Sequence, residues 1–139
     1  GLAFLSAEIL QTIEASKEHK SLIPFAEELA EKLKLTQKIL EKLMPHALSG
    51  DYERYLADAS IFMEFFSLIL IGWTWLEIAT EAEENLNKTD SPYSDEFYIG
   101  KIETMKYFFG YELPKTLGHA SILMNDSTVT IKKEKEYIN

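Results

Sequence analysis

The stretch FFSLILIGWTWLEIA, residues 65–79, is the most apolar part of the 139-residue chain and decides which folds are open to it. Its twelve residues from Phe65 to Leu76 carry no charge, and Glu77 follows them directly. A helix that crosses a membrane needs about 20 apolar residues, whereas a run of roughly 10–14 is typical of a buried helix. The length of this run therefore predicts a core helix and no membrane span.

Apolar residues surround the whole circumference of this helix between Ile61 and Ala79. A helix that is apolar on every side must be covered on every side, and a small bundle covers only part of it. The surplus face is therefore expected to contact either a neighbouring domain or a second subunit, which would make the protein a homodimer. The residues expected at this interface are Phe65, Phe66, Ile69, Trp73 and Trp75.

Helical periodicity extends through most of the remaining chain. Apolar stripes at helical spacing cover residues 2–13, 22–47 and 98–123, and one long helix is expected from about 51 to 87. Short polar breaks separate these segments. The pattern predicts an all-α fold, an up-and-down four-helix bundle over residues 1–124.

Local signals predict where the helices begin, end and bend. Pro24 suits a first helical turn, Gly50 suits the left-handed residue after a helix, Asp51 can cap the next helix, and Ser94 can cap the last one. Pro114 removes one hydrogen bond from the last helix, which predicts a kink there.

The C-terminal tail, residues 125–139, differs from the rest of the chain. Residues 128–131 (TVTI) favour extended backbone, and the charged KKEKE that follows favours solvent. The tail is therefore expected to be a short extended piece or a loose end.

Charge and composition exclude several classes of partner and site. The net charge is −9, and residues 61–100 hold eight acidic residues and one basic residue. Such a chain repels phosphate backbones and anionic lipid, so we expect no nucleic-acid partner. The absence of cysteine excludes disulfides and thiolate sites and fits a cytoplasmic protein. The chain begins with Gly instead of Met, which suggests a piece of a longer protein.

No catalytic, cofactor-binding or metal-binding residue is predicted. None of the three histidines has Glu three residues before it, which excludes the di-iron pattern of helical bundles. Glu64 and Glu77 lie about 20 Å apart along one helix, too far to share a substrate atom. His119 is interpreted as a structural histidine.

Aromatic residues allow two interpretations, a ligand pocket between helices or ordinary core. Helical spacing favours the core. The residues concerned are Trp73, Trp75, Tyr98, Tyr107, Phe108, Phe109 and Tyr111.

Two stretches resemble the extra C-terminal helical domain of a subgroup of acyl-CoA dehydrogenases that includes the methylmercaptopropionyl-CoA dehydrogenases. They are DASIFMEFFSLILIGWTWLEIATEAEE (Asp58–Glu84) and DEFYIGKIETMKYFFGYELPKTLGHASIL (Asp95–Leu123). The features that match include Gly72-Trp73, the pair Tyr107-Phe108 and the Leu113-Pro114 kink. The resemblance covers residues 22–124 and leaves the tail without a counterpart.

This resemblance implies an accessory domain that supports domain packing or oligomer assembly of a flavoenzyme. Such enzymes hold FAD and oxidise acyl-CoA to 2-enoyl-CoA, with the catalytic carboxylate and the flavin contacts in the preceding domains. No site residue is therefore carried over to this chain. Two alternatives stay open, a stand-alone helical dimerisation module without enzymatic activity and a small-molecule binder with an aromatic-lined pocket.

Overall fold

The protein is described by a computed structural model that covers residues 1–50 and 52–125, except for the side chains of His46, Ala47 and Ser49. These residues contain no strand, which confirms the all-α prediction. The predicted extended tail lies outside them, except for Asn125. The helices are α1 (Leu2–Ser16), α2 (Ile23–Ser49), α3 (Tyr52–Asn85), α4 (Asp95–Tyr107) and α5 (Lys115–Leu123), with a 3₁₀ turn at Lys20–Leu22 and a π turn at Phe108–Glu112.

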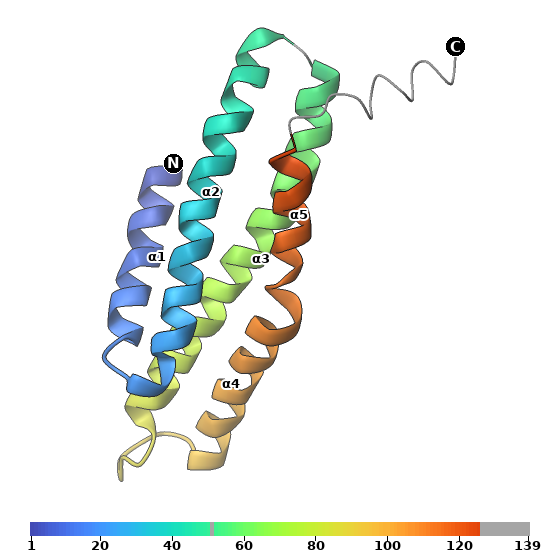
Figure 1. Cartoon of the computed structure of the whole chain (residues 1–139). Coiled ribbons are helices and arrows are strands. Elements are labelled where there is room, and N and C mark those ends of the chain that lie inside the picture. The colour runs from blue at the N-terminus through green and yellow to red at the C-terminus, as the bar shows by residue number, and fades with distance from the viewer. Residues whose placement is uncertain (51, 126–139) are drawn as a thin grey trace.

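The helices form an elongated up-and-down bundle in which α4 and α5 together make the fourth arm (Figure 1). The α2–α3 hairpin extends beyond the start of α1 and the end of α5 (Figure 1). Helix α3 packs against α1, α2, α4 and α5, so it is the central element. This position explains why apolar residues occupy most of its circumference between Ile61 and Ala79.

The local signals for helix ends are confirmed. Pro24 lies at the start of α2, and Gly50 follows the helix with a φ of 81° in the left-handed region. Ser94 caps α4, because its Oγ accepts a hydrogen bond of 3.2 Å from the backbone N–H of Phe97. The predicted cap at Asp51 lies outside the described residues.

The last helix is interrupted where the sequence predicts, but in a different form. The α-helical pattern ends at Tyr107, and a π turn follows in which the N–H of Leu113 donates to the carbonyl of Phe108 at 2.9 Å. Pro114 then precedes the first residue of α5. The wider turn takes up the local mismatch at the proline, so the bend does not come from Gly110 alone.

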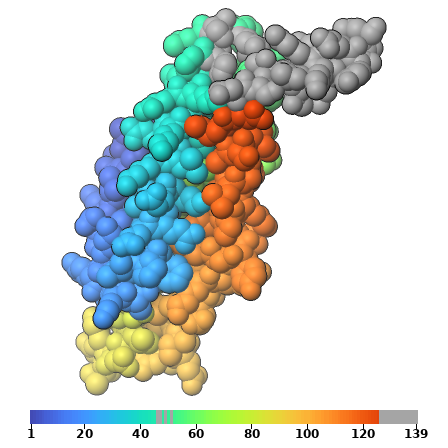
Figure 2. Space-filling model, viewed as in Figure 1, coloured from blue at the N-terminus to red at the C-terminus, as the bar shows by residue number. Residues whose placement is uncertain are grey.

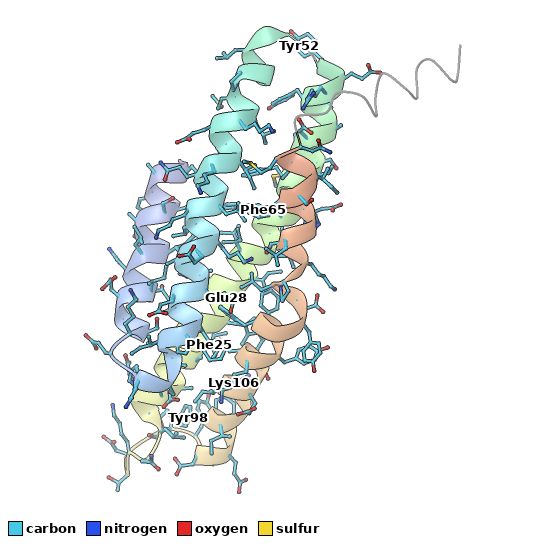
Figure 3. All side chains as sticks on the ribbon, in the orientation of Figure 1. Phe25, Glu28, Tyr52, Phe65, Tyr98 and Lys106 are labelled. Atoms are coloured by element: carbon cyan, nitrogen blue, oxygen red, sulfur yellow. The ribbon has the colours of Figure 1, made fainter. Side chains whose placement is uncertain are left out.

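The core runs along the axis of the bundle and draws on every helix. Phe65 points from α3 into this core (Figure 3). At the middle of α3, Gly72 faces the π turn, because a Cβ there would lie 3.4 Å from Phe108 and 3.5 Å from Leu113. The fully buried apolar side chains include Ile9, Ile13, Leu22, Leu29, Ile39, Phe65, Ile69, Leu76, Met105 and Leu113.

Candidate functional site

The five residues expected at an interface do not share one environment. Phe65 and Ile69 are fully buried and Phe66 is nearly so, which makes them core residues of this chain. Trp73 and Trp75 are half-buried and pack at the edge of the core. In this conformation the first three offer almost no surface to a partner.

Trp73 is held in place by a hydrogen bond between helices. Its Nε1–H donates to Oγ1 of Thr12 on α1 at 2.8 Å. An indole N–H that leaves water needs such an acceptor, and here a second helix supplies it. The tryptophan therefore ties α1 to α3.

An exposed apolar row lies on the outer side of α3 and is formed by Leu56, Met63 and Ile71. Their exposed fractions are 65%, 61% and 44%. At 100° per residue the three positions fall within about 80° of one another around the helix. This row is the candidate interaction surface. Sequence periodicity missed it, because the same sector of α3 also carries the exposed polar residues Ser60, Ser67 and Thr74.

The two carboxylates that flank the apolar run, Glu64 and Glu77, make contacts in different parts of the bundle. Glu64 Oε2 lies 3.2 Å from Nε2 of His119 and joins α3 to α5. Glu77 lines a shallow acidic groove between α1 and α3 together with Glu81 and Glu84. The two do not converge on one point, as their sequence separation predicts.

The aromatic side chains do not gather around one pocket. Tyr107 and Tyr111 stack on each other at 4.8 Å and are exposed to solvent. Phe108 and Phe109 are buried in the core. Tyr98 lies near the α3–α4 connection (Figure 3), where its hydroxyl accepts a hydrogen bond from the N–H of Tyr93. The core interpretation fits the two phenylalanines, whereas the two tyrosines face outward.

Two grooves flank α2, which lies between α1 and α5 on the face shown in Figure 2. The α1–α2 groove has a volume of about 580 Å³ and is mainly apolar, with Leu10 and Leu33 among its lining residues. The α2–α5 groove has a volume of about 610 Å³ and carries more charge, including Lys32 and Lys38. Lys32 is almost completely buried.

Burial shifts two ionisable groups on α2, one turn apart. Desolvation raises the pKa of Glu28 above its usual value, and the nearby Lys32 lowers it only in part. Desolvation likewise lowers the pKa of Lys32, against the smaller opposing effect of Glu28. Lys32 was missed at the sequence level, although its position three residues after Leu29 and four before Thr36 lies within the α2 stripe.

Metal and membrane criteria give different results. Residues 1–50 and 52–125 hold no group of three or more His, Asp or Glu side chains placed to bind a metal ion. By length and composition alone, α3 qualifies as a membrane-crossing helix, with 28% of its most apolar 18-residue window buried. A single such helix is weak evidence, because core helices of soluble proteins meet the same criterion. The predicted absence of a membrane span therefore stays a prediction.

The family model described as "Acetyl-CoA dehydrogenase C-terminal like" matches residues 5–132 of the chain. The matched range begins within α1 and includes α2 to α5, so it spans the bundle. No curated protein and no solved structure matches the chain.

Proposed function

The chain belongs to the acetyl-CoA dehydrogenase C-terminal-like family, and from this premise we propose that it is the accessory C-terminal domain of a flavin-dependent acyl-CoA dehydrogenase. We call that enzyme the parent enzyme. The proposed reaction of the parent is oxidation of an acyl-CoA to the 2-enoyl-CoA, with FAD held outside this domain. The matches to Gly72-Trp73 and Leu113-Pro114 support a parent of the methylmercaptopropionyl-CoA dehydrogenase subgroup.

The proposed role of this domain is packing and assembly. The observation that carries it is the exposed apolar row of Leu56, Met63 and Ile71 on α3, the helix that also packs against α1, α2, α4 and α5. The core is complete without these three side chains, so the fold does not need them to be apolar. A row of this kind fits the surface of a neighbouring domain or subunit.

The surrounding chemistry agrees with a structural role. Glu64 is engaged by His119, and the aromatic side chains are either core or surface. We therefore place the catalytic carboxylate and the flavin contacts in the rest of the parent enzyme. The cysteine-free composition of this chain supports the proposal that the chain is cytoplasmic.

Expression of the complete product of the native gene tests this proposal. The purified protein should show the visible absorption bands of a bound flavin, and a panel of acyl-CoA thioesters should bleach them. A complete gene product that is colourless, or that consists of this bundle alone, would contradict the proposal.

A stand-alone helical dimerisation module is the alternative. The same exposed row on α3 favours it, because two copies could pack along their α3 helices. This alternative predicts that the isolated chain has the native mass of a dimer, as measured by sedimentation equilibrium. It also predicts a gene that encodes no flavin-binding domain.

A further inference from the structure

The part of α2 nearest the α2–α3 hairpin carries exposed apolar side chains. Met44 and Leu48 are 54% and 83% exposed, and Leu48 is the most exposed large apolar side chain in the part of the chain that the structure describes. At 100° per residue, Leu40, Met44 and Leu48 fall within about 80° of one another around α2. Leu40 lines the mainly apolar α1–α2 groove. The two exposed side chains therefore continue the line of this groove beyond its end.

Helix α1 begins level with Leu40 and does not reach the two exposed residues. The helices α1 and α2 run antiparallel, and the hairpin extends beyond the start of α1 (Figure 1). Leu2 and Ala3, at the start of α1, line the groove together with Leu40. At 1.5 Å per residue, Met44 and Leu48 lie about 6 and 12 Å further along α2 than Leu40. About two additional helical turns before Leu2 would therefore pass alongside both of them.

The start of α1 lacks the side chains that usually begin a helix. Its first turn holds no acidic residue, and Gly1 at the cap position has no side chain to accept a hydrogen bond. In α4, by contrast, Ser94 caps the helix, and Asp95 and Glu96 occupy the first turn. The first N–H groups of a helix need acceptors, and a preceding helical turn would supply them. The local sequence therefore gives no signal that the helix begins at Leu2.

The apolar stripe of α1 also continues to the first residue of the helix. Leu5, Ile9 and Ile13 pack in the core, and Leu2 falls on the same side of the helix at helical spacing. Ile9 is fully buried, whereas Leu2 is 39% exposed. The stripe is thus still apolar where its cover ends. Further turns of the same stripe would lie against α2 and add to the cover of Leu2.

We propose that α1 continues for about two turns into the preceding part of the parent enzyme, and that this continuation packs on Met44 and Leu48. We call the roughly eight residues directly before Gly1 in the parent enzyme the preceding segment. The inference rests on the proposed function, because that function places the rest of the parent enzyme before residue 1.

The point of attachment favours the preceding segment over a second copy of the chain. The segment is covalently joined to α1 where the exposed line on α2 begins, so its effective concentration there is high. A second copy would have to be held by two side chains, Met44 and Leu48, without such a link. A continuous helix at this junction would also fix the orientation of the bundle on the parent enzyme.

Hydrogen exchange of the complete gene product, followed by mass spectrometry, tests the proposal. Backbone amides of the preceding segment should exchange about tenfold more slowly, or slower still, than the same sequence as a free peptide, because helical hydrogen bonds protect them. Leu48→Glu should speed their exchange by about tenfold, since local opening then no longer exposes a buried leucine. In the isolated chain the same substitution should leave the melting temperature nearly unchanged, because Leu48 is exposed there.

Leu117→Glu is the matched control, because Leu117 is 61% exposed and lies on α5. It should leave exchange of the preceding segment unchanged, and so should Leu48→Met, which keeps an apolar side chain. Exchange at the rate of the free peptide would overturn the proposal, as would equal effects of the two glutamate variants. Loss of native mass in Leu48→Glu with unchanged exchange would assign the surface to a second copy instead. A lower melting temperature of the isolated chain would assign Leu48 to its own fold.

Flavin absorbance of the complete gene product decides the proposed function separately. A yellow protein whose preceding segment exchanges freely rejects only the helical continuation. A colourless protein whose preceding segment is protected and responds to Leu48→Glu rejects only the dehydrogenase assignment. A gene product that consists of this bundle alone rejects both.

Discussion

Trp73 and Thr12 join the central helix to the first helix of the bundle through one side-chain hydrogen bond of 2.8 Å. The variant Thr12→Val removes the acceptor and keeps nearly the same shape, so the indole N–H loses its partner at a half-buried site. We expect the free energy of unfolding to fall by about 1–2 kcal/mol, as measured by urea denaturation.

Thr74→Val is the control for this experiment. The Thr74 hydroxyl is exposed and donates to the carbonyl of Leu70 on its own helix, so its removal should have little effect on stability. Equal effects of the two valine variants would show that the hydrogen bond between Trp73 and Thr12 contributes nothing specific.

Gly72 faces the π turn at a distance that leaves room for one methyl group and no more. A Cβ there would contact Phe108 at 3.4 Å and Leu113 at 3.5 Å, both ordinary contact distances. Gly72→Ala should therefore be neutral or stabilising by up to about 1 kcal/mol, through higher helix propensity. Gly72→Leu should overpack the site and destabilise the chain by roughly 1–3 kcal/mol or more.

Gly100→Leu is the comparison, because a Cβ at Gly100 meets no atom within 4 Å. Thermal unfolding followed by circular dichroism should show loss of stability for leucine at position 72 and none at position 100. Tolerance of leucine at both positions would mean that the core relaxes around Gly72 at low cost.

Glu28 should make the stability of the chain depend on pH in the sense opposite to most carboxylates. Its pKa is raised in the folded state, so its penalty is present at neutral pH and disappears as pH falls through the raised pKa towards 4.5. Glu28→Gln removes that penalty, and partly offsets the gain by removing a charge near Lys32. A modest net stabilisation is expected at pH 7, because burial of the charged carboxylate outweighs its attraction to Lys32.

Urea denaturation of the Glu28→Gln variant at pH 7 and at pH 4.5 checks this prediction. The gain in stability should be smaller at pH 4.5 than at pH 7, because the raised pKa makes the folded wild-type carboxyl take up a proton more readily than an ordinary glutamate does. Glu27→Gln on the exposed side of α2 serves as the control. A loss of stability at pH 7 would show that attraction to Lys32 outweighs the burial of Glu28.

Ile71 should matter for assembly and not for folding. Because this side chain is 44% exposed, Ile71→Glu should change the stability of the isolated chain by less than about 0.5 kcal/mol. In the complete gene product the same change places a charge in the proposed contact, so the domain should become more sensitive to protease or the native mass should fall.

Ile99→Glu is the matched substitution for Ile71→Glu, because Ile99 is 47% exposed on α4 and lies outside the row on α3. It should leave protease sensitivity and native mass unchanged. Assembly that is equally intact in both variants would rule out the outer side of α3 as the contact surface.

Sequence patterns predicted the features that neighbouring residues determine. The Ser94 cap and the left-handed Gly50 follow from the chemistry of one or two side chains. Helix α2 continues through Pro45 to Ser49, as the apolar stripe to residue 47 and Gly50 predicted. Glu41, whose carbonyl loses its partner at the proline, lies on the exposed side of the helix, where water can solvate it.

Features that depend on the arrangement of helices could not be predicted in the same way. Phe65 and Ile71 are both large and apolar, yet one is fully buried and the other lies on the surface. Because apolar residues occupy most of the circumference of α3, the positions of the surrounding helices distinguish the two. The burial of Lys32 is the one such feature with a signal in the sequence, because this lysine lies within the mainly apolar stripe of α2.

The π turn is a place where the last helix can lose one residue without changing the direction in which its later side chains point. The turn at Phe108–Glu112 holds one residue more than a regular α-helical turn. Deletion of Gly110 would therefore convert the turn into regular helix and leave α5 in its present rotational phase. Deletion of Gly100 would instead rotate every later residue by about 100° and turn the core side of α5 towards solvent.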